Sequence, residues 1–305
     1  MTSSNRVRFF FFNVCMLFLL FFSAKTYASI GDCLVCHNNK EFEMTLDNGS
    51  TVSLYINSGK FRSSIHGKFD CVICHTDYKV NIHEQKMQES KTDNKEIDII
   101  AKTKGRQKIV LLSCINCHKK EFNDYRQSIH GKVALEGNHD APECIDCHGD
   151  HYIRPSDDLE STVNPSEAPT TCAKCHNEAL LMARYDINTY TYITYEESFH
   201  GKKLKLGSGR VPACTSCHGV HDIRAPEDPA SEVNEANRLK TCGKCHTGAS
   251  VKFVLGFSHN MPSPKVDPLI FYVGLIYKWF IIIMISAMAI YVILDFFKTI
   301  FVRRS

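Results

Sequence analysis

Between residues 29 and 268 the sequence lacks long runs in which apolar residues recur with a helical period or alternate as in a strand. Such runs build the apolar core of an ordinary globular domain. Glycine, proline, asparagine and aspartate are scattered through this segment and favour short elements joined by turns. The missing periodicity therefore excludes a conventional core of that size, and another component must supply the interior.

Net positive charge is also missing from this segment, although the whole chain carries +3. Arg6, Arg8 and Lys25 contribute +3 at the N-terminal end, and residues 269–305 contribute another +3, which leaves −3 for residues 29–268. A basic surface is the usual signature of a nucleic-acid-binding protein. The charge therefore argues against nucleic acid and favours redox partners that carry basic patches.

Cysteine is almost absent outside one motif. Fourteen of the fifteen cysteines lie in seven copies of C-x-x-C-H, and the remaining one is Cys15. A C-x-x-C pair alone fits half a zinc site, a redox dithiol or part of a disulfide framework. A histidine directly after every pair is instead the attachment signature of c-type haem, in which two thiols bind the porphyrin and the histidine ligates the iron. The sequence therefore predicts seven covalently bound c-type haems, whose porphyrins would form the missing core.

The residues of the seven motifs divide into two sets. The predicted haem-attaching cysteines are Cys33, Cys36, Cys71, Cys74, Cys114, Cys117, Cys144, Cys147, Cys172, Cys175, Cys214, Cys217, Cys242 and Cys245. The predicted proximal iron ligands are His37, His75, His118, His148, His176, His218 and His246.

An internal duplication organises the remaining histidines. Residues 128–176 match residues 198–246 at a constant offset of 70 without a gap. The pattern S-[IF]-H-G-K occurs three times, and a histidine stands three residues after the motif histidine in two C-x-x-C-H-G-x-H stretches. The predicted distal ligands are His66, His83, His130, His151, His200, His221 and His259. His139 is left over, and its repeat equivalent is Gly209.

Histidine on both faces would leave the irons without an open position, which favours electron transfer over substrate chemistry. His221 lies too near His218 in sequence to reach over the same ring, so we expect it to ligate a neighbouring haem. The alternative is a loop histidine that bonds a haem propionate. Met261 is an alternative ligand to His259. The sequence does not indicate which distal histidine serves which iron.

The N-terminal end has the form of a secretory signal peptide. Arg6 and Arg8 precede the apolar run Phe9–Phe22, and a site of small residues follows, with cleavage expected after Ala28. An uncleaved N-terminal anchor is the alternative. Both interpretations export the chain that follows, in agreement with haem attachment outside the cytoplasm.

The C-terminal end contains a predicted transmembrane helix, Leu269–Phe297. Lys278 interrupts it and is expected either to reach the outer interface or to pair with a group on a partner membrane subunit. The basic tail 298–305 places the C-terminus in the cytoplasm. The haem domain is then expected on the periplasmic side of the inner membrane.

The expected fold is a multihaem cytochrome c, with mostly short α-helices and irregular loops around a haem core, little β-structure and one C-terminal transmembrane helix. The first haem module contains a short strand-like insertion, Phe42–Ile56. The predicted order is a signal peptide 1–28, a dihaem module 29–86, a charged linker 87–110, a five-haem repeat region 111–262, a transmembrane helix 269–297 and a tail 298–305.

These motifs, over roughly residues 31–260, resemble those of the membrane-anchored multihaem c-type cytochromes of anaerobic respiratory chains. Residues 44–77 are particularly similar to proteins of bacteria that reduce metals, sulfur or nitrogen compounds. The resemblance implies electron transfer between a quinol-oxidising membrane subunit, often a b-type cytochrome, and periplasmic or extracellular acceptors. The C-terminal anchor differs from the N-terminal anchor of the quinol-dehydrogenase cytochromes of the nitrite and nitrate systems.

The main expectation is therefore an electron carrier and not an enzyme, with no catalytic residue. One alternative is a multihaem reductase or oxidase with one open haem. Such enzymes often carry a C-x-x-C-K motif, whereas every motif here ends in histidine. Another alternative is an electron-transfer subunit fixed in a larger respiratory complex.

Overall fold

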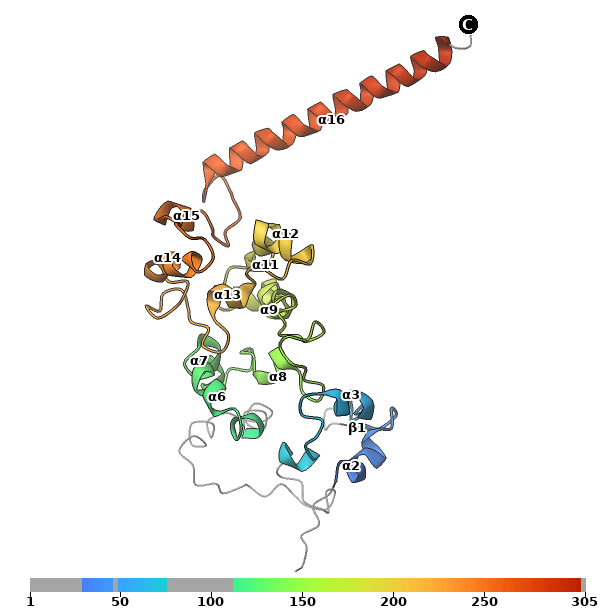
Figure 1. Cartoon of the computed structure of the whole chain (residues 1–305), viewed down its shortest axis with the longest axis vertical. Helices are drawn as coiled ribbons and strands as arrows, with labels where there is room; N and C mark the ends of the chain where they lie inside the picture. Colours follow the sequence, from blue (N-terminus) through green and yellow to red (C-terminus); the bar gives the residue numbers. More distant parts are fainter. Residues whose placement is uncertain (1–28, 46–48, 76–111, 303–305) are drawn as a thin grey trace, which may run out of the picture. The chain divides into compact units, whose positions relative to one another are not determined.

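The computed structural model describes residues 29–45, 49–75 and 112–302, and these are mostly helical with little strand (Figure 1). The chain divides into two compact units, which are described separately below: Met1–Thr162 with His221–Ile223, and Val163–Val220 with Arg224–Ser305. The predicted signal peptide and the predicted linker lie outside the described residues. The predicted boundary between a dihaem module and a repeat region falls in the same part and stays a prediction.

The first unit contains short helices and one hairpin. Strands β1 and β2 pair antiparallel with Met44 opposite Val52, which confirms the short strand-like insertion at Phe42–Ile56. The elements of this unit are α2 Ile30–His37, β1 Glu43–Thr45, β2 Thr51–Ser53, α3 Ser58–Ser63, the 3₁₀ turn Cys71–Ile73, α6 Lys119–Tyr125, α7 Ile129–Leu135 and α8 Cys144–His148.

The second unit is helical in the part that the structure describes. Its helices are α9 Ala168–His176, α10 Ala179–Ala183, α11 Thr191–Glu197, α12 Phe199–Lys205, α13 Cys214–His218, α14 Glu235–Gly243, α15 Val251–Leu255 and α16 Pro268–Val302. Helices α12 and α13 lie 70 residues after α7 and α8, in agreement with the duplication seen in the sequence.

Side-chain caps explain how such short helices begin. The hydroxyl of Ser128 accepts a hydrogen bond from the N–H of Gly131 at 2.9 Å, at the start of α7. Ser198 makes the equivalent bond to Gly201 at 3.2 Å, at the start of α12. Each bond satisfies a backbone donor that has no partner inside the helix, which is the role of serine at this position.

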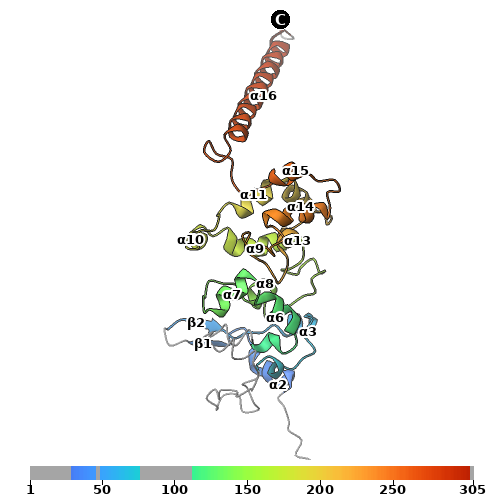
Figure 2. The same cartoon turned by 90° about the vertical axis from the view of Figure 1, so that its left-hand side faces the viewer.

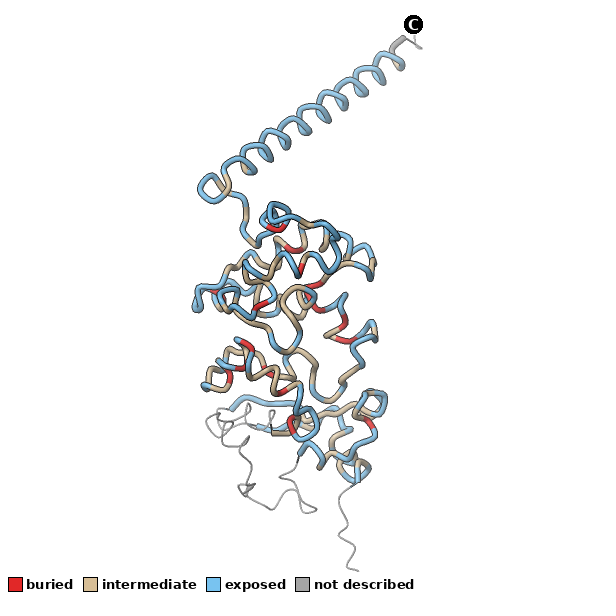
Figure 3. The backbone as a smooth tube through the Cα atoms, turned by 60° about the vertical axis from the view of Figure 1, so that its left-hand side comes forward, coloured by how far each residue is buried: buried red, intermediate tan, exposed pale blue. Residues whose placement is uncertain are grey.

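Apolar packing is sparse in both units. Figure 3 shows the buried positions as short, scattered stretches of the backbone tube. Among the described residues, Ile115 and Phe122 form a small cluster that Leu112 and Leu135 flank. The buried hydrophobic residues of the described part are Ile115, Phe122, Ala134, Ala168, Met182, Tyr195, Ala213 and Val254. This small set fits the expectation that the interior is not filled by apolar side chains.

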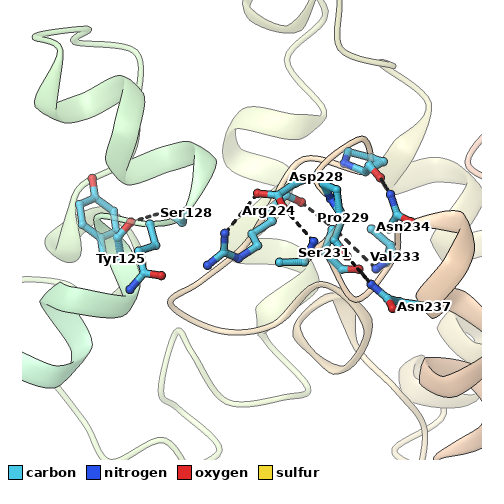
Figure 4. A network of polar contacts seen from close by, with 12 residues as sticks. Tyr125, Ser128, Arg224, Asp228, Pro229, Ser231, Val233, Asn234 and Asn237 are labelled. Atoms are coloured by element: carbon cyan, nitrogen blue, oxygen red, sulfur yellow. Dashed lines mark hydrogen bonds and ion pairs between the residues drawn. The ribbon is translucent and has the colours of Figure 1, made fainter.

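Hydrogen bonds fix loops where apolar packing is thin, as Figure 4 shows for the loop between α13 and α14. Arg224 pairs with Asp228 at 3.2 Å, and the hydroxyl of Ser231 donates to the backbone oxygen of Arg224. The equivalent loop of the first unit repeats the arrangement, with Arg154 paired to Asp158 at 2.8 Å. The two copies of the duplication therefore share loop structure as well as sequence.

Helix α16 is continuous from Pro268 to Val302, so it extends beyond the predicted Leu269–Phe297 and includes Lys298 (Figure 2). Among the described helices it is the one long and apolar enough to cross a bilayer, over Pro268–Ile300. None of the side chains in its most apolar stretch is buried. Length and composition therefore permit a membrane span, as the sequence predicts.

Candidate functional site

Ten of the predicted histidine ligands face one another in five pairs, and each pair joins one motif histidine to one predicted distal histidine. The distances between ring centres are nearly the same in all five. They are 6.1 Å for His118 and His66, 6.0 Å for His75 and His151, 6.0 Å for His148 and His221, 6.1 Å for His246 and His200, and 6.2 Å for His218 and His259.

This distance suits two imidazoles that share one metal ion. A metal lies about 2.0–2.1 Å from an imidazole nitrogen, and the nitrogen lies about 1.1 Å from its ring centre, which gives about 6.3 Å between two ring centres on opposite sides. Ordinary aromatic contacts have ring centres about 4.5–7 Å apart, a range that also includes these pairs. The spacing of the five pairs leaves room for one metal ion between each two rings, and it equally fits direct contact of the rings.

Burial favours the neutral, metal-binding form in several of these imidazoles. Burial, with the facing histidine as a second cause, lowers the pKa of His75, His148 and His218, the last to about 4. Burial is also the main cause that lowers the pKa of His66 and His200. A metal ligand must be a neutral imidazole, and these shifts favour the neutral form at pH 7.

The δ nitrogens of several of these histidines point at acceptors. The Nδ1 atom of His37 lies 2.8 Å from the carbonyl oxygen of Leu54, and because a carbonyl can only accept, Nδ1 carries the proton. Nδ1 of His151 lies 3.4 Å from Asp150, and Nδ1 of His118 lies 3.8 Å from Glu121. An acceptor at Nδ1 leaves Nε2 as the nitrogen available to a metal.

A glycine turn separates His221 from its own motif. Gly219 follows His218 with φ of 83°, in the left-handed region that favours glycine. Gly149 has φ of 77° at the same place after His148. His221 therefore faces His148 and not its sequence neighbour His218, in agreement with the expectation from spacing. Its role as an iron ligand stays a prediction.

In the first unit, backbone hydrogen bonds join the segments that carry the histidines of the S-[IF]-H-G-K pattern to the segments that carry the second histidine of the C-x-x-C-H-G-x-H stretches. The N–H of Ile65, next to His66, donates to the carbonyl of Ile153 at 3.0 Å. The N–H of Ile129, next to His130, donates to the carbonyl of Ile223 at 2.8 Å. The same bond thus joins an S-I-H-G-K segment to an H-x-I-R segment twice.

The glycine of S-[IF]-H-G-K allows close packing against the preceding helix. A Cβ atom at Gly131 would overlap the backbone of Tyr125, and one at Gly201 would overlap Tyr195. The tyrosine hydroxyls then donate to the carbonyls of Pro142 and Pro212, at 2.8 and 2.9 Å. The sequence analysis gave no role to these glycines and tyrosines. The two tyrosines are also 70 residues apart, so the duplication could have been followed to three residues before Ser128.

Two polar side chains that sequence reasoning also missed support His259. The hydroxyl of Thr194 lies 3.0 Å from Nδ1 of His259, and Nδ2 of Asn188 donates to the His259 carbonyl at 2.6 Å. The ring of Phe257 lies 5.5 Å from that of His259 and 6.1 Å from that of His200. His259, and not the alternative Met261, faces His218.

Four predicted ligands fall outside these pairs. His37 has the Leu54 contact and an edge-on contact with Phe42 at 5.2 Å. His130 is the second residue of α7 in the first unit, and His176 is the last residue of α9 in the second, where burial lowers its pKa. Both of these histidines have further contacts of their own. His83 lies outside the described residues.

Cysteines of consecutive motifs approach one another within each unit. Sulfur contacts join Cys33 to Cys71 and Cys114 to Cys144 in the first unit, and Cys172 to Cys214 in the second. None of the fourteen motif cysteines forms a disulfide within the described residues. Among the described residues, no group of three or more histidine, cysteine, aspartate or glutamate side chains is arranged to hold a metal ion by itself.

No protein-family model matches the chain, and no solved structure matches it.

Proposed function

We propose that this protein is a membrane-anchored, periplasmic heptahaem c-type cytochrome that relays electrons between a quinol-linked membrane donor, such as a b-type cytochrome, and periplasmic or extracellular acceptors. The observation that carries the proposal is the set of five histidine pairs, each with ring centres 6.0–6.2 Å apart and each beginning at a C-x-x-C-H motif. When bound, haem iron would supply one-electron redox chemistry.

The donor set fits haem better than a bare metal ion. A structural zinc site takes four protein ligands, whereas a haem iron already has four porphyrin nitrogens and needs two more ligands at most. The histidines come in twos, and two cysteines precede one member of every pair at the spacing of covalent attachment. The residues that would hold the seven haems are the fourteen motif cysteines, the seven motif histidines and the predicted distal histidines, ten of these histidines being the members of the five pairs.

The chain's own residues would keep these sites closed to substrates. The paired histidines would exclude water and small ligands from a bound haem iron, and acceptors near Nδ1 of His37 and His151 orient these imidazole rings. The sulfur contacts between consecutive motifs would bring neighbouring cofactors close together within each unit. Closed, adjacent sites favour a relay over a catalytic centre.

The membrane part of the proposal rests on α16, which is followed by Arg303 and Arg304. Basic residues after a span favour a cytoplasmic C-terminus, which would place the haem-binding units in the periplasm. The acidic balance of residues 29–268 favours redox partners that present basic patches.

A haem assay with low-temperature electron paramagnetic resonance on the detergent-solubilised protein tests the proposal. The expected result is seven covalent haems per chain and low-spin iron with two nitrogen ligands throughout. A preparation without covalent haem would overturn the proposal. A reduced protein that readily binds carbon monoxide would favour a reductase with an open iron instead.

A further inference from the structure

The strongest unexplained contacts in the second unit converge on His259, and the inference drawn from them rests on the function proposed above. Thr194, on α11, places Oγ1 2.7 Å from the carbonyl oxygen of Tyr190 and 3.0 Å from Nδ1 of His259. A hydroxyl has one proton, and the carbonyl can only accept it. Thr194 therefore accepts at its second contact, so Nδ1 of His259 carries the proton and Nε2 is free.

Other groups around the ring agree with this assignment. The backbone of Thr191 offers His259 a second hydrogen-bond acceptor. No carboxylate touches the His259 side chain in the contacts of the described residues, so its δ proton is shared with neutral oxygens. The ring planes of His218 and His259 differ by 26°. Thr194 thus fixes both the tautomer and the orientation of the ring.

Asn188 holds the main chain of the same residue. Its Nδ2 atom donates to the His259 carbonyl at 2.6 Å and to the side chain of Asn260 at 3.1 Å. Its Oδ1 atom accepts from the N–H of Tyr190 at 2.8 Å. Asn188 therefore connects the segment that carries His259 to the start of α11, the helix that carries Thr194.

If the offset of 70 is continued before Ser128, the two copies differ at these positions. At the offset of 70, Asn188 takes the place of His118, and residues 184–188, RYDIN, take the place of the haem motif at residues 114–118. Thr194 takes the place of Asp124, whose carboxylate interacts electrostatically with His221. The same helical position thus carries a carboxylate that interacts electrostatically with His221 in the first copy and a hydroxyl that contacts His259 in the second.

We propose that Thr194, together with Asn188, is a positioning residue that holds Nε2 of His259 toward His218 and thereby keeps that iron closed to added ligands. Neither residue touches the metal itself. The amide of Asn188 supports the backbone of His259.

The test compares four variants of the full-length, haem-loaded protein in detergent: Thr194→Val, Thr194→Ser, Thr299→Val and Asn188→Asp. Thr194→Val removes the hydroxyl and keeps the shape, and Thr194→Ser retains the hydroxyl. Thr299→Val is the matched control, because the Thr299 hydroxyl also donates to a carbonyl four residues earlier, at 2.9 Å, but lies on α16. The readouts are the haem count, the low-spin resonance signals and carbon monoxide binding after reduction.

The expected result is that Thr194→Val shifts the low-spin signal of one iron and opens one of the seven reduced haems to carbon monoxide, whereas Thr194→Ser and Thr299→Val match the wild type. Asn188→Asp removes the amide donor and is expected to open the same iron. If the Thr194→Val protein does not accumulate in cells, Asn188→Asp tests the positioning role in its place. Seven haems with unchanged signals and no carbon monoxide binding in both variants would overturn the positioning role alone. A wild type with missing or open haems would overturn the proposed function instead.

Discussion

His221 lies opposite His148 with ring centres 6.0 Å apart and planes 23° apart, although it follows His218 by only three residues. The left-handed turn at Gly219 directs the chain away from His218. The same relationship holds for His151, which faces His75 and not its neighbour His148. Each short C-x-x-C-H-G-x-H stretch therefore supplies one histidine to each of two different pairs.

Replacement of His221 should open one haem, that of His148. In His221→Ala one iron is expected to become high-spin, and in the double variant His151→Ala, His221→Ala two irons should do so, because these histidines face different partners. His221→Met should raise the potential of one haem, since a methionine ligand favours a higher potential than histidine. Resonance spectra and a redox titration measure these effects.

The control for these variants is His139→Ala, at an exposed position that belongs to none of the five pairs. It should leave all irons low-spin. If His221→Ala leaves all irons low-spin as well, His221 is a loop histidine that bonds a propionate and not a ligand.

Gly201→Ala should destabilise the second unit. Its Cβ would overlap the backbone of Tyr195, and relief of such a clash costs roughly 1–3 kcal/mol. Gly209→Ala is the matched control, because a Cβ there meets no atom within 4 Å. Thermal unfolding followed by circular dichroism should show a lower midpoint for the first variant only. Equal midpoints would mean that the contact between α11 and α12 is not tight.

The protein should lose stability at alkaline pH through Tyr195. Burial raises the pKa of this phenol from 10.0 to about 12. The unfolded chain therefore loses the phenolic proton first, and stability that is present below pH 10 falls as pH rises toward 12. Denaturant unfolding of the wild type and Tyr195→Phe across this range measures the effect.

The phenylalanine variant should be less stable at pH 8 by about 1 kcal/mol, because it loses the hydrogen bond to Pro212. It should also lose less stability than the wild type between pH 10 and 12. Parallel pH profiles for the two proteins would contradict the assignment to Tyr195.

A chain that ends before Pro268 should leave the membrane fraction and keep its seven haems. The apolar side chains of α16 are exposed, and the motif histidines and cysteines all precede this helix. Fractionation of cells that produce the full-length and shortened chains, with a haem stain, measures the change. Retention of the shortened chain in carbonate-washed membranes would show that α16 is not the main anchor.

The sequence alone predicted the short helices, the small hairpin and the long apolar helix. Glycine, proline and helix-capping serine affect the backbone only within a few residues, so their effects can be predicted from the local sequence. The first unit's β1 and β2 confirm the insertion expected at Phe42–Ile56. The end of α16 at Val302 was missed, because a helix continues past the apolar stretch where nothing stops it.

The sequence by itself determined which residues can hold haem, because covalent attachment needs C-x-x-C-H within five neighbouring residues. The tertiary structure alone decided which histidines face each other, since the partners lie from 41 to 76 residues apart. It also decided that Asn188 and Thr194 support His259. Such contacts depend on how the helices pack and on the turn at Gly219, and no local pattern of residues records either of them.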